Sequence, residues 1–311
     1  MSAAEPLTEG QKEHFRANGW LRLSNCFTQE QADWVIKDVW TRLGADPADQ
    51  ATWKALNNMP HHRSFDCSEF SPRAWAAICE LCGGEDRVAP ESKEWRDSLI
   101  VSLGSEEHAG TDPSPGDLGR WHVDGDFFVH YLDSPEQGLL VIPLFTDIVP
   151  GGGGTCICPE ATAKVARHLR DHPEGVSPRM QPRGHPDFAR EKNLDWFNNL
   201  AKGCDDFVEA HGEVGDVYLL HPLMLHSASR NPLRRLRVIT NPPVSLRQPH
   251  RFDRTDGSEY SLVEQATLRA LEAESLPGWK ITAEREGVVP ERLKVQARMK
   301  EEELKRLAAA A

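Results

Sequence analysis

The sequence lacks the features that would place it in several large classes of protein. No apolar run approaches the roughly 18–20 residues of a membrane span, and the N-terminus has no apolar stretch typical of a secretory signal. The formal net charge of −12 argues against general binding to nucleic acid or anionic membranes. The seven cysteines are an odd and scattered set, which favours free thiols in a reducing compartment. Together these absences predict a cytoplasmic protein without a nucleic-acid or membrane partner.

Two cysteine pairs lie close together in the chain, and both are interpreted as structural. Cys79 and Cys82 form one CxxC with no second pair, at the end of a helical pattern that Gly83 and Gly84 stop. Cys156 and Cys158 lie two apart in the strand-like TCIC, so the alternation of a strand places them on one face.

The order of patterns along the chain predicts a single domain, 1–311, with three parts. Residues 1–96 favour helices that support the core, and residues 246–311 favour helices again. The part between them, 97–245, is rich in short apolar strands, with an insert at 160–210 that mixes a helix with a Pro/Gly/His-rich loop.

Helix starts and strands can be placed within this outline. Capping boxes predict helices that begin after Thr8, Thr28 and Ser261, each with Gln or Glu three residues later. Five tryptophans in the helical part are expected in the core: Trp34, Trp40, Trp53, Trp75 and Trp95. The strands are DSLIVSLG, DFFVHYL, GLLVIPLFTDI, GTCICP, GDVYLLH and RLRVITNPPVSL. Short strands separated by Gly and Pro predict a mainly β fold, an antiparallel sandwich or jelly roll, rather than alternating strands and helices.

Four short patterns place a histidine two residues before a carboxylate, which is a spacing that non-heme iron enzymes use. Such enzymes hold Fe(II) with two histidines and one carboxylate and leave positions open for O₂ and a co-substrate. The four pairs are His122/Asp124, His172/Glu174, His185/Asp187 and His211/Glu213. Prolines beside the second and third pairs are poorly suited to a central strand, and the fourth lies in a turn only 15 residues before His226. This context favours His122 and Asp124.

A third ligand is expected on a later strand. The segment GDVYLLHPLMLHSASRN offers His221 and His226, and Arg237 follows His226 at a separation of 11. An arginine that points into a barrel needs an anionic partner, because an unpaired buried charge is costly. A dicarboxylate co-substrate would supply that partner. Arg234 and Arg235 are interpreted as solvated surface residues.

The chain resembles the phytanoyl-CoA dioxygenase family of Fe(II)/2-oxoglutarate oxygenases. The resemblance covers roughly residues 7–245 and rests on HFRANGWLRL, WHVDGD, LFTDIVPGGGGTCICP and GDVYLLHPLMLHSASRNPLRRLR. It implies a double-stranded β-helix, a jelly-roll fold also called cupin-like. It also implies that His122, Asp124 and His226 bind iron, that Arg237 binds 2-oxoglutarate and that Thr155 touches this co-substrate. Where the family often has Pro-Gly-Ser-His, this chain has Pro159-Glu160-Ala161-Thr162, so the substrate of better-known members does not carry over.

The resemblance implies an oxygenase that uses Fe(II), 2-oxoglutarate and O₂ to oxidise a C–H bond of a small molecule, with release of succinate and CO₂. Asp124 argues against a halogenase, which needs a non-ligating residue at that position. The abundant tryptophan favours a hydrophobic substrate, and a homodimer is compatible with the sequence. Two alternatives stay open: a non-redox metal-dependent isomerase or hydrolase, and a non-catalytic metal-binding module. Phe127, Phe128 and Tyr131 are expected to form the pocket wall, while the sequence leaves the roles of Asp126 and His130 open.

Overall fold

Alternating side chains along short apolar strands build two layers of antiparallel strands. In the computed structural model of the chain, the central strand β6 (Leu139–Pro143) is buried on both faces. Leu140 and Ile142 belong to the apolar cluster between the layers, while Leu139 and Val141 pack with the N-terminal helices. This two-residue period is the one that a doubly buried strand imposes.

The larger layer contains β6 and strands from both ends of the chain. Its other strands are β1 (Trp20–Leu23), β2 (Leu56–Asn58), β5 (Ile100–Ser102), β9 (Val217–Leu220), β11 (Arg237–Ile239) and β12 (Pro243–Val244). The hydrogen-bonded orders are β1-β9-β6-β12 and β11-β5-β2. A bridge between Leu144 and Ile239 joins the two groups, and Phe145 donates its backbone N–H to the carbonyl of Val238 at 3.0 Å.

The smaller layer has the order β10-β7-β8, formed by β10 (Leu225–Ala228), β7 (Thr155–Cys158) and β8 (Val208–Ala210). Beyond β10, His122 forms an isolated antiparallel bridge with His226 and extends this layer by one short segment. The remaining strands, β3 (Ser64–Asp66) and β4 (Glu94–Arg96), pair with each other outside both layers. All of the pairings are antiparallel.

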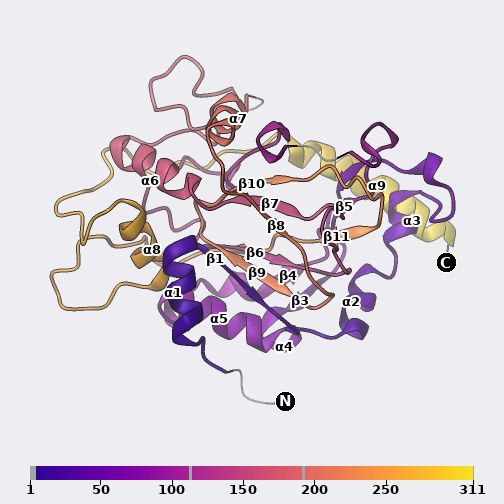
Figure 1. Ribbon diagram of the computed structural model, residues 1–311, viewed down its shortest axis with the longest axis horizontal. Helices are drawn as coiled ribbons and strands as arrows, with labels where there is room; N and C mark the ends of the chain where they lie inside the picture. The colour runs from indigo at the N-terminus through magenta and orange to yellow at the C-terminus, as the bar shows by residue number, and fades with distance from the viewer. Residues whose placement is uncertain (1–4, 112–113, 191–192, 311) are drawn as a thin grey trace.

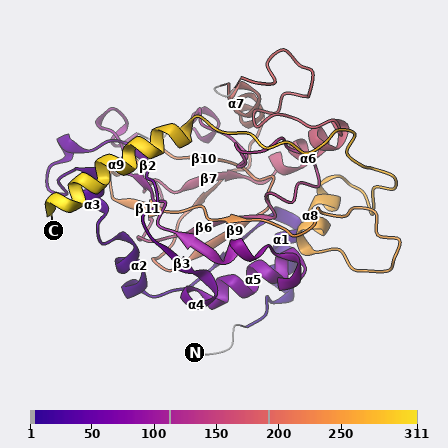
Figure 2. The same cartoon turned by 180° about the vertical axis from the view of Figure 1, so that it is seen from behind.

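Helices cover the outer faces of the layers (Figures 1 and 2). The N-terminal set packs on the larger layer and consists of α1 (Glu9–Asn18), α2 (Gln29–Ile36), α3 (Val39–Leu43), α4 (Cys67–Phe70) and α5 (Pro72–Cys82). On the smaller layer, α6 (Ala161–Asp171) and α7 (Asp195–Lys202) pack against Cys156, Cys158 and Leu225. Helix α8 (Leu262–Ala270) contacts α1, α5 and α6, and α9 (Arg292–Ala310) lies against α3.

The expected helix starts are confirmed. Thr8, Thr28 and Ser261 are the N-caps of α1, α2 and α8, and each forms the reciprocal capping box. Cys79 and Cys82 lie in α5 and are buried in the core, and Gly83 ends that helix in the left-handed region with φ of 91°. Among the tryptophans, Trp75 and Trp95 are core residues, but Trp34 is 43% exposed and is not a core anchor.

The structure corrects two expectations about the strands. The helices contain more of the described residues than the strands do, so the fold is not mainly β. The segment DFFVHYL forms no regular strand: Phe128 bridges Gly287, and His130 bridges Val176. Because these two partners come from different parts of the chain, no continuous ladder forms along the segment.

The structure describes residues 5–111, 114–190 and 193–310. Over these ranges no helix is both long enough and apolar enough to span a membrane. The strands in the same ranges form separate small antiparallel sheets rather than one closed barrel.

Candidate metal centre

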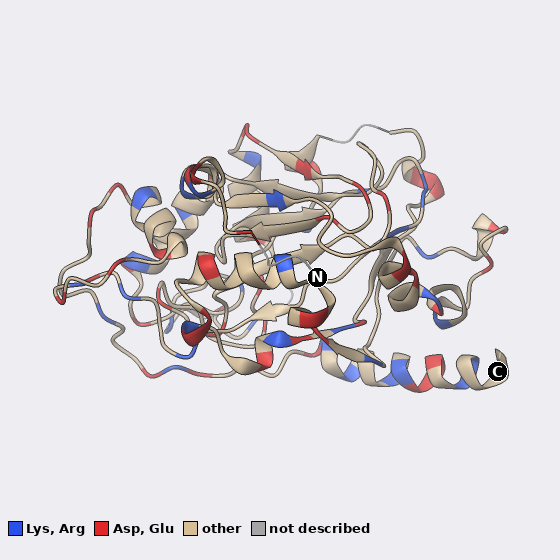
Figure 3. Ribbon diagram, turned by 90° about the horizontal axis from the view of Figure 1, so that it is seen from below, with Lys and Arg blue, Asp and Glu red and all other residues tan. Residues whose placement is uncertain are grey.

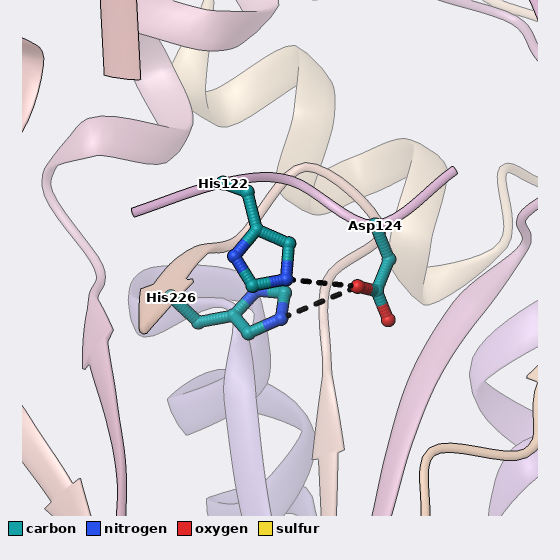
Figure 4. A group of neighbouring side chains, drawn as sticks. All are labelled: His122, Asp124 and His226. Atoms are coloured by element: carbon teal, nitrogen blue, oxygen red, sulfur yellow. Dashed lines mark ion pairs between the residues drawn. The ribbon is translucent and has the colours of Figure 1, made fainter. Parts of the chain in front are cut away.

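Two histidines lie side by side at the edge of the smaller layer. His122 and His226 are directly opposite each other, and the backbone N–H of each donates to the carbonyl of the other at 3.0 Å. Directly opposed residues of an antiparallel pair project from the same face. The ring centroids are accordingly 4.3 Å apart, and Figure 4 shows both rings turned toward Asp124.

Backbone carbonyls orient both rings. Nδ1 of His122 lies 2.9 Å from the carbonyl oxygen of Arg120, and Nδ1 of His226 lies 3.0 Å from that of Met224. Since a carbonyl oxygen can only accept, each Nδ1 carries the ring proton. Each Nε2 therefore keeps a free lone pair, which is the form in which histidine binds a metal.

Asp124 completes the group. Its Oδ1 is 3.3 Å from Nε2 of His122 and 3.4 Å from Nε2 of His226. Its Oδ2 accepts a hydrogen bond of 3.1 Å from Nδ2 of Asn241. Metal–ligand bonds of about 2.1 Å at right angles place neighbouring donor atoms about 3 Å apart. The observed spacing is close to that of three ligands on one face of a metal ion.

Burial and charge act together in this group. The side chain of His226 is 8% exposed, that of Asp124 19% and that of His122 35%. Burial raises the pKa of Asp124, but the two histidines outweigh it and hold that pKa well below its usual range. Burial lowers the pKa of His226, and the attraction of Asp124 reverses this to a net rise. The carboxyl group is thus ionised at neutral pH, as a metal ligand must be.

The other histidine candidates lie outside this group. His221, next to β9, accepts from the backbone N–H of Leu223 at 3.1 Å and donates to Oγ1 of Thr267 at 2.9 Å. Both of its ring nitrogens are therefore satisfied, and burial lowers its pKa to about 3. His172 pairs with its own Glu174 at 2.8 Å. His185 and His211 make local contacts with backbone atoms two residues away.

Arg237 is a buried cation whose hydrogen-bond acceptors, among the described residues, are backbone carbonyls rather than carboxylates. It lies in β11 with 1% exposure, on the same face as Ile239, which packs between the layers. Its Nε donates to the carbonyl of Gly153 at 2.7 Å, and its Nη1 donates to that of Ile100 at 3.3 Å. Burial lowers its pKa to about 10, and Glu209 opposes this shift. The guanidinium is still charged at neutral pH and has only neutral acceptors here.

Thr155 lies on the inner face of β7. It is buried, it pairs with Ala228, and the next residue on its face is Ile157, which pairs with His226. Gly153, the acceptor of the Arg237 bond, precedes it by two residues in the turn before β7. The structure therefore brings Thr155 and Arg237 to the same turn.

A small pocket adjoins Asp124. Its lining residues are Asp124, Phe128, His130, Tyr131, Leu132, Ser134, Gln137, Pro222, Leu223 and His250. Phe128 and Tyr131 thus lie in a pocket wall, as expected, whereas Phe127 does not line this pocket and is 38% exposed. His130 lines the pocket, and burial lowers its pKa to about 4. Asp126 turns away from the pocket to an ion pair with Arg292.

Two residues of the site were not found from the sequence. Asn241, which holds Asp124, lies in the stretch ITNPP, which has the composition of a turn. His250 is 6% exposed, and within the described part of the chain neither of its ring nitrogens has a hydrogen-bond partner, although Nδ1 lies 3.9 Å from Oε1 of Glu264. Buried histidines whose ring nitrogens lack hydrogen bonds are rare, and this rarity is what marks His250 in the structure. The sequence does not show that His250 is buried, so sequence patterns could not identify it.

No family model and no curated protein matches this chain. Three solved structures illustrate the similarities that exist. The non-heme alpha-ketoglutarate-dependent carbocyclase SnoK from nogalamycin biosynthesis is 14% identical, with a TM-score of 0.39 over 79% of this chain and 86% of SnoK. HygX from Streptomyces hygroscopicus, with nickel and 2-oxoglutarate bound, is 14% identical, with a TM-score of 0.39 over 77% of this chain and 87% of HygX. EctD from S. alaskensis with bound Fe is 17% identical, with a TM-score of 0.43 over 82% and 84% of the two chains.

Proposed function

We propose that the chain is an Fe(II)/2-oxoglutarate-dependent oxygenase whose iron ligands are His122, Asp124 and His226. One observation carries the proposal: two free Nε2 atoms and one carboxylate oxygen converge at metal-ligand spacing. Two imidazoles and one carboxylate on one face suit Fe(II) and leave the opposite face open for other ligands. With 2-oxoglutarate and O₂, such an iron supplies an oxidant for C–H bonds and yields succinate and CO₂.

The order of the strands supports a double-stranded β-helix as the core. From β5 to β11, successive segments alternate between the layers: β5, β6, β9 and β11 lie in the larger one, and the His122 segment, β7 with β8, and β10 lie in the smaller one. A jelly roll has this alternation, because each connection crosses from one sheet to the other. Two of the three proposed ligands, His122 and His226, lie opposite each other at the edge of the smaller layer.

Arg237 and Thr155 are the proposed residues for 2-oxoglutarate. Among the described residues the guanidinium of Arg237 donates to two backbone carbonyls and to no carboxylate, and a buried cation in this state is destabilising. A carboxylate that enters beside Gly153 would accept two parallel N–H bonds from the planar guanidinium. The hydroxyl of Thr155, at the start of the strand that follows the Gly153 turn, would donate to the same carboxylate. Neither residue touches the metal ligands, so their loss should leave metal binding intact.

The walls beside Asp124 supply the environment for a substrate. Phe128, Leu132 and Leu223 present apolar surface next to the carboxylate ligand. Apolar walls exclude water, which protects a reactive site from side reactions. Asn241 holds the second oxygen of Asp124, so the first one stays directed at the metal position. This environment favours a small substrate with an apolar part near the metal.

The decisive experiment is the binding of 2-oxoglutarate to Arg237 variants under anaerobic conditions with Fe(II). Truncation of one partner of a charge-assisted pair costs about 2–5 kcal/mol, so Arg237→Ala should lower the affinity roughly 30-fold or more. Arg237→Lys should recover part of the loss, because an ammonium lacks the bidentate fork. Calorimetry and succinate release measure the two effects separately.

Arg235→Gln is the matched control, because Arg235 lies two residues away and is exposed. Arg234 is less suitable, since it is half-buried and its guanidinium lies 5.8 Å from the ring centroid of Trp53, which corrects the expectation of a solvated side chain. Equal affinities in the wild type and in Arg237→Ala would remove the co-substrate role. Turnover without O₂ would instead support a non-redox metalloenzyme.

A further inference from the structure

A second group of metal-ligating side chains lies on the opposite face of the smaller layer from His226. We propose that Cys158, Glu160 and Cys204 bind a divalent cation of the Zn²⁺ type, as a site separate from the proposed iron centre. Cys158 ends β7 on its outer face, Glu160 immediately precedes α6, and Cys204 follows α7. Three element ends thus converge at one point.

The ligand atoms are already close to binding geometry. The two Sγ atoms and a carboxylate oxygen of Glu160 all lie within 4.8 Å of one another. In a tetrahedral zinc site, bonds of about 2.3 Å to sulfur and about 2.0 Å to oxygen place the ligand atoms about 3.5–4 Å apart. Movements of about 1 Å or less would therefore complete the set, with water as the fourth ligand.

Neighbouring backbone groups hold two of the ligands in place. Sγ of Cys204 donates to the carbonyl of Leu200 at 3.2 Å. Oε1 of Glu160 accepts from the backbone N–H of Asp205 at 3.3 Å. Cys158 is fully buried and lies in a paired strand opposite Leu225. A fixed arrangement of this kind lowers the entropy cost of binding a metal.

The chain places its own cation beside these ligands. Nζ of Lys164 lies 3.7 Å from Oε1 of Glu160 and 3.6 Å from Sγ of Cys204, and it donates to the carbonyl of Gly203 at 3.0 Å. The group therefore already attracts positive charge. A divalent metal would displace the ammonium from the carboxylate and the sulfur, so Lys164 acts as a competitor for the site.

Binding must release protons. Burial raises the pKa of both thiols, so the reduced protein holds Cys158 and Cys204 protonated at neutral pH. The metal binds thiolates, and each thiol proton passes to the solvent as its metal–sulfur bond forms. Glu160 is already ionised, because its contact with the side chain of Cys204, among others, lowers its pKa. Two protons are thus released for each cation bound.

The test is a titration of the reduced full-length protein with Co²⁺, followed by sulfur-to-cobalt charge-transfer absorption. The His226→Ala variant is the background, because it removes the proposed iron site and leaves one cobalt equivalent to be bound. Cys158→Ser and Cys204→Ser should each abolish the absorption band. Cys156→Ser should keep it, since Cys156 lies on the same face of β7 but outside the group.

The Lys164→Gln variant distinguishes a metal site from a group whose three side chains only stabilise the fold. Removal of the competing ammonium should tighten Co²⁺ binding roughly two- to fivefold, because exposed ion pairs of this kind are weak. Thermal unfolding of each variant shows whether it folds. If Cys158→Ser, in a paired strand, does not fold, Cys204→Ser, in the loop after α7, is the second variant.

Three outcomes would overturn the proposal. The first is the absence of a band in the reduced background protein, and the second is a band that survives in both serine variants. The third is weaker binding in Lys164→Gln. If the reduced protein binds no cobalt but oxidised glutathione converts the two thiols into a disulfide, with loss of two hydrogens in the intact mass, the pair is a site of thiol–disulfide exchange instead.

Discussion

At the scale of single residues, two histidines only five positions apart have opposite environments. His226 has one ring nitrogen bonded to a backbone carbonyl and the other directed at Asp124. His221 has both ring nitrogens bonded within the protein. A ring with a free lone pair can bind a metal, whereas a fully bonded ring contributes only to stability.

His226→Ala should therefore abolish Mn²⁺ binding by the group His122, Asp124 and His226, while His221→Ala should keep it. His221→Ala should instead lower the free energy of unfolding by about 1–3 kcal/mol, since the N–H of Leu223 loses its acceptor and Thr267 loses its donor. Calorimetric titration with Mn²⁺ and thermal unfolding measure the two effects. Retention of metal by His226→Ala together with its loss in His221→Ala would show that the distal ligand is His221.

Glu264 in α8 should make the stability of the fold depend on acid pH. Burial raises its pKa, but hydrogen bonds from Arg87 and the backbone N–H of Arg251, among other contacts, lower it to about 2. Because the folded pKa lies below the unfolded value of about 4.5, the stabilisation is present above pH 4.5 and is lost as the pH falls toward 2. The shift corresponds to about 3 kcal/mol.

Glu264→Gln should be less stable than the wild type at pH 7, and the difference should shrink as the pH falls below about 4.5. Urea unfolding at several pH values measures it. Glu259→Gln is the control, because Glu259 is exposed and lies five residues earlier in the same region. A gap between wild type and Glu264→Gln that stays constant from pH 7 to pH 3 would contradict the assignment.

At the scale of elements, the C-terminal segment supports the loop that carries Asp124. Asp126 forms an ion pair with Arg292, the first residue of α9, with Nη2 2.7 Å from Oδ1. The N–H of Val288 donates to the carbonyl of Phe127 at 2.7 Å, and that of Val129 donates to the carbonyl of Glu286 at 2.9 Å. The proposed iron ligand Asp124 thus lies two residues before a segment, 126–129, that residues 286–292 hold in place.

Helix α9 is itself anchored by one buried carboxylate. Lys, Arg and Glu follow one another along its surface (Figure 3), yet Glu303 is only 1% exposed. Its Oε2 accepts from Nε of Arg42 at 2.9 Å and lies 2.8 Å from Nε2 of His62. Loss of one partner in such a buried group is strongly destabilising, so α9 is held firmly against α3.

Arg292→Gln should loosen the segment 126–129 without loss of the fold. Hydrogen exchange at the amides of Val129 and Val288 should become faster, and metal affinity should fall roughly tenfold, because contacts behind a ligand typically have this effect. Arg298→Gln is the control, since Arg298 is an exposed arginine on the same helix. Unchanged exchange and affinity in Arg292→Gln would show that Asp126 needs no such support.

At the scale of the whole molecule, features that depend on neighbouring residues could be predicted from the sequence, whereas contacts between distant segments could not. The capping boxes at Thr8, Thr28 and Ser261 involve residues three apart, and the structure contains all three. The segment DFFVHYL has the composition of a strand, but its backbone partners are Gly287 and Val176. Composition reports the preference of a segment and cannot report which distant segments it will meet.

The same limit applies to the candidate sites. The proposed pair His122 and Asp124 is local, and the proposed third ligand was reached through a resemblance, which supplied the distant partner. Asn241 is 117 residues from Asp124, and no pattern links the two. The sequence indicates only a structural role for Cys158 and no role for Cys204. The two residues come together because the loop after α7 lies beside the end of β7, and this long-range arrangement is not visible in the sequence.

The ion pair between Arg292 and Asp126 also has a consequence for folding during synthesis on the ribosome. The two residues are 166 positions apart in the chain. At the usual rates of synthesis, about 5–20 residues per second, Asp126 leaves the ribosome roughly 10–30 s before Arg292. During that interval the loop with Asp124 has neither its ion pair nor the backbone contacts of residues 286–288. The proposed iron centre therefore acquires the full support of its Asp124 loop only when α9 has docked.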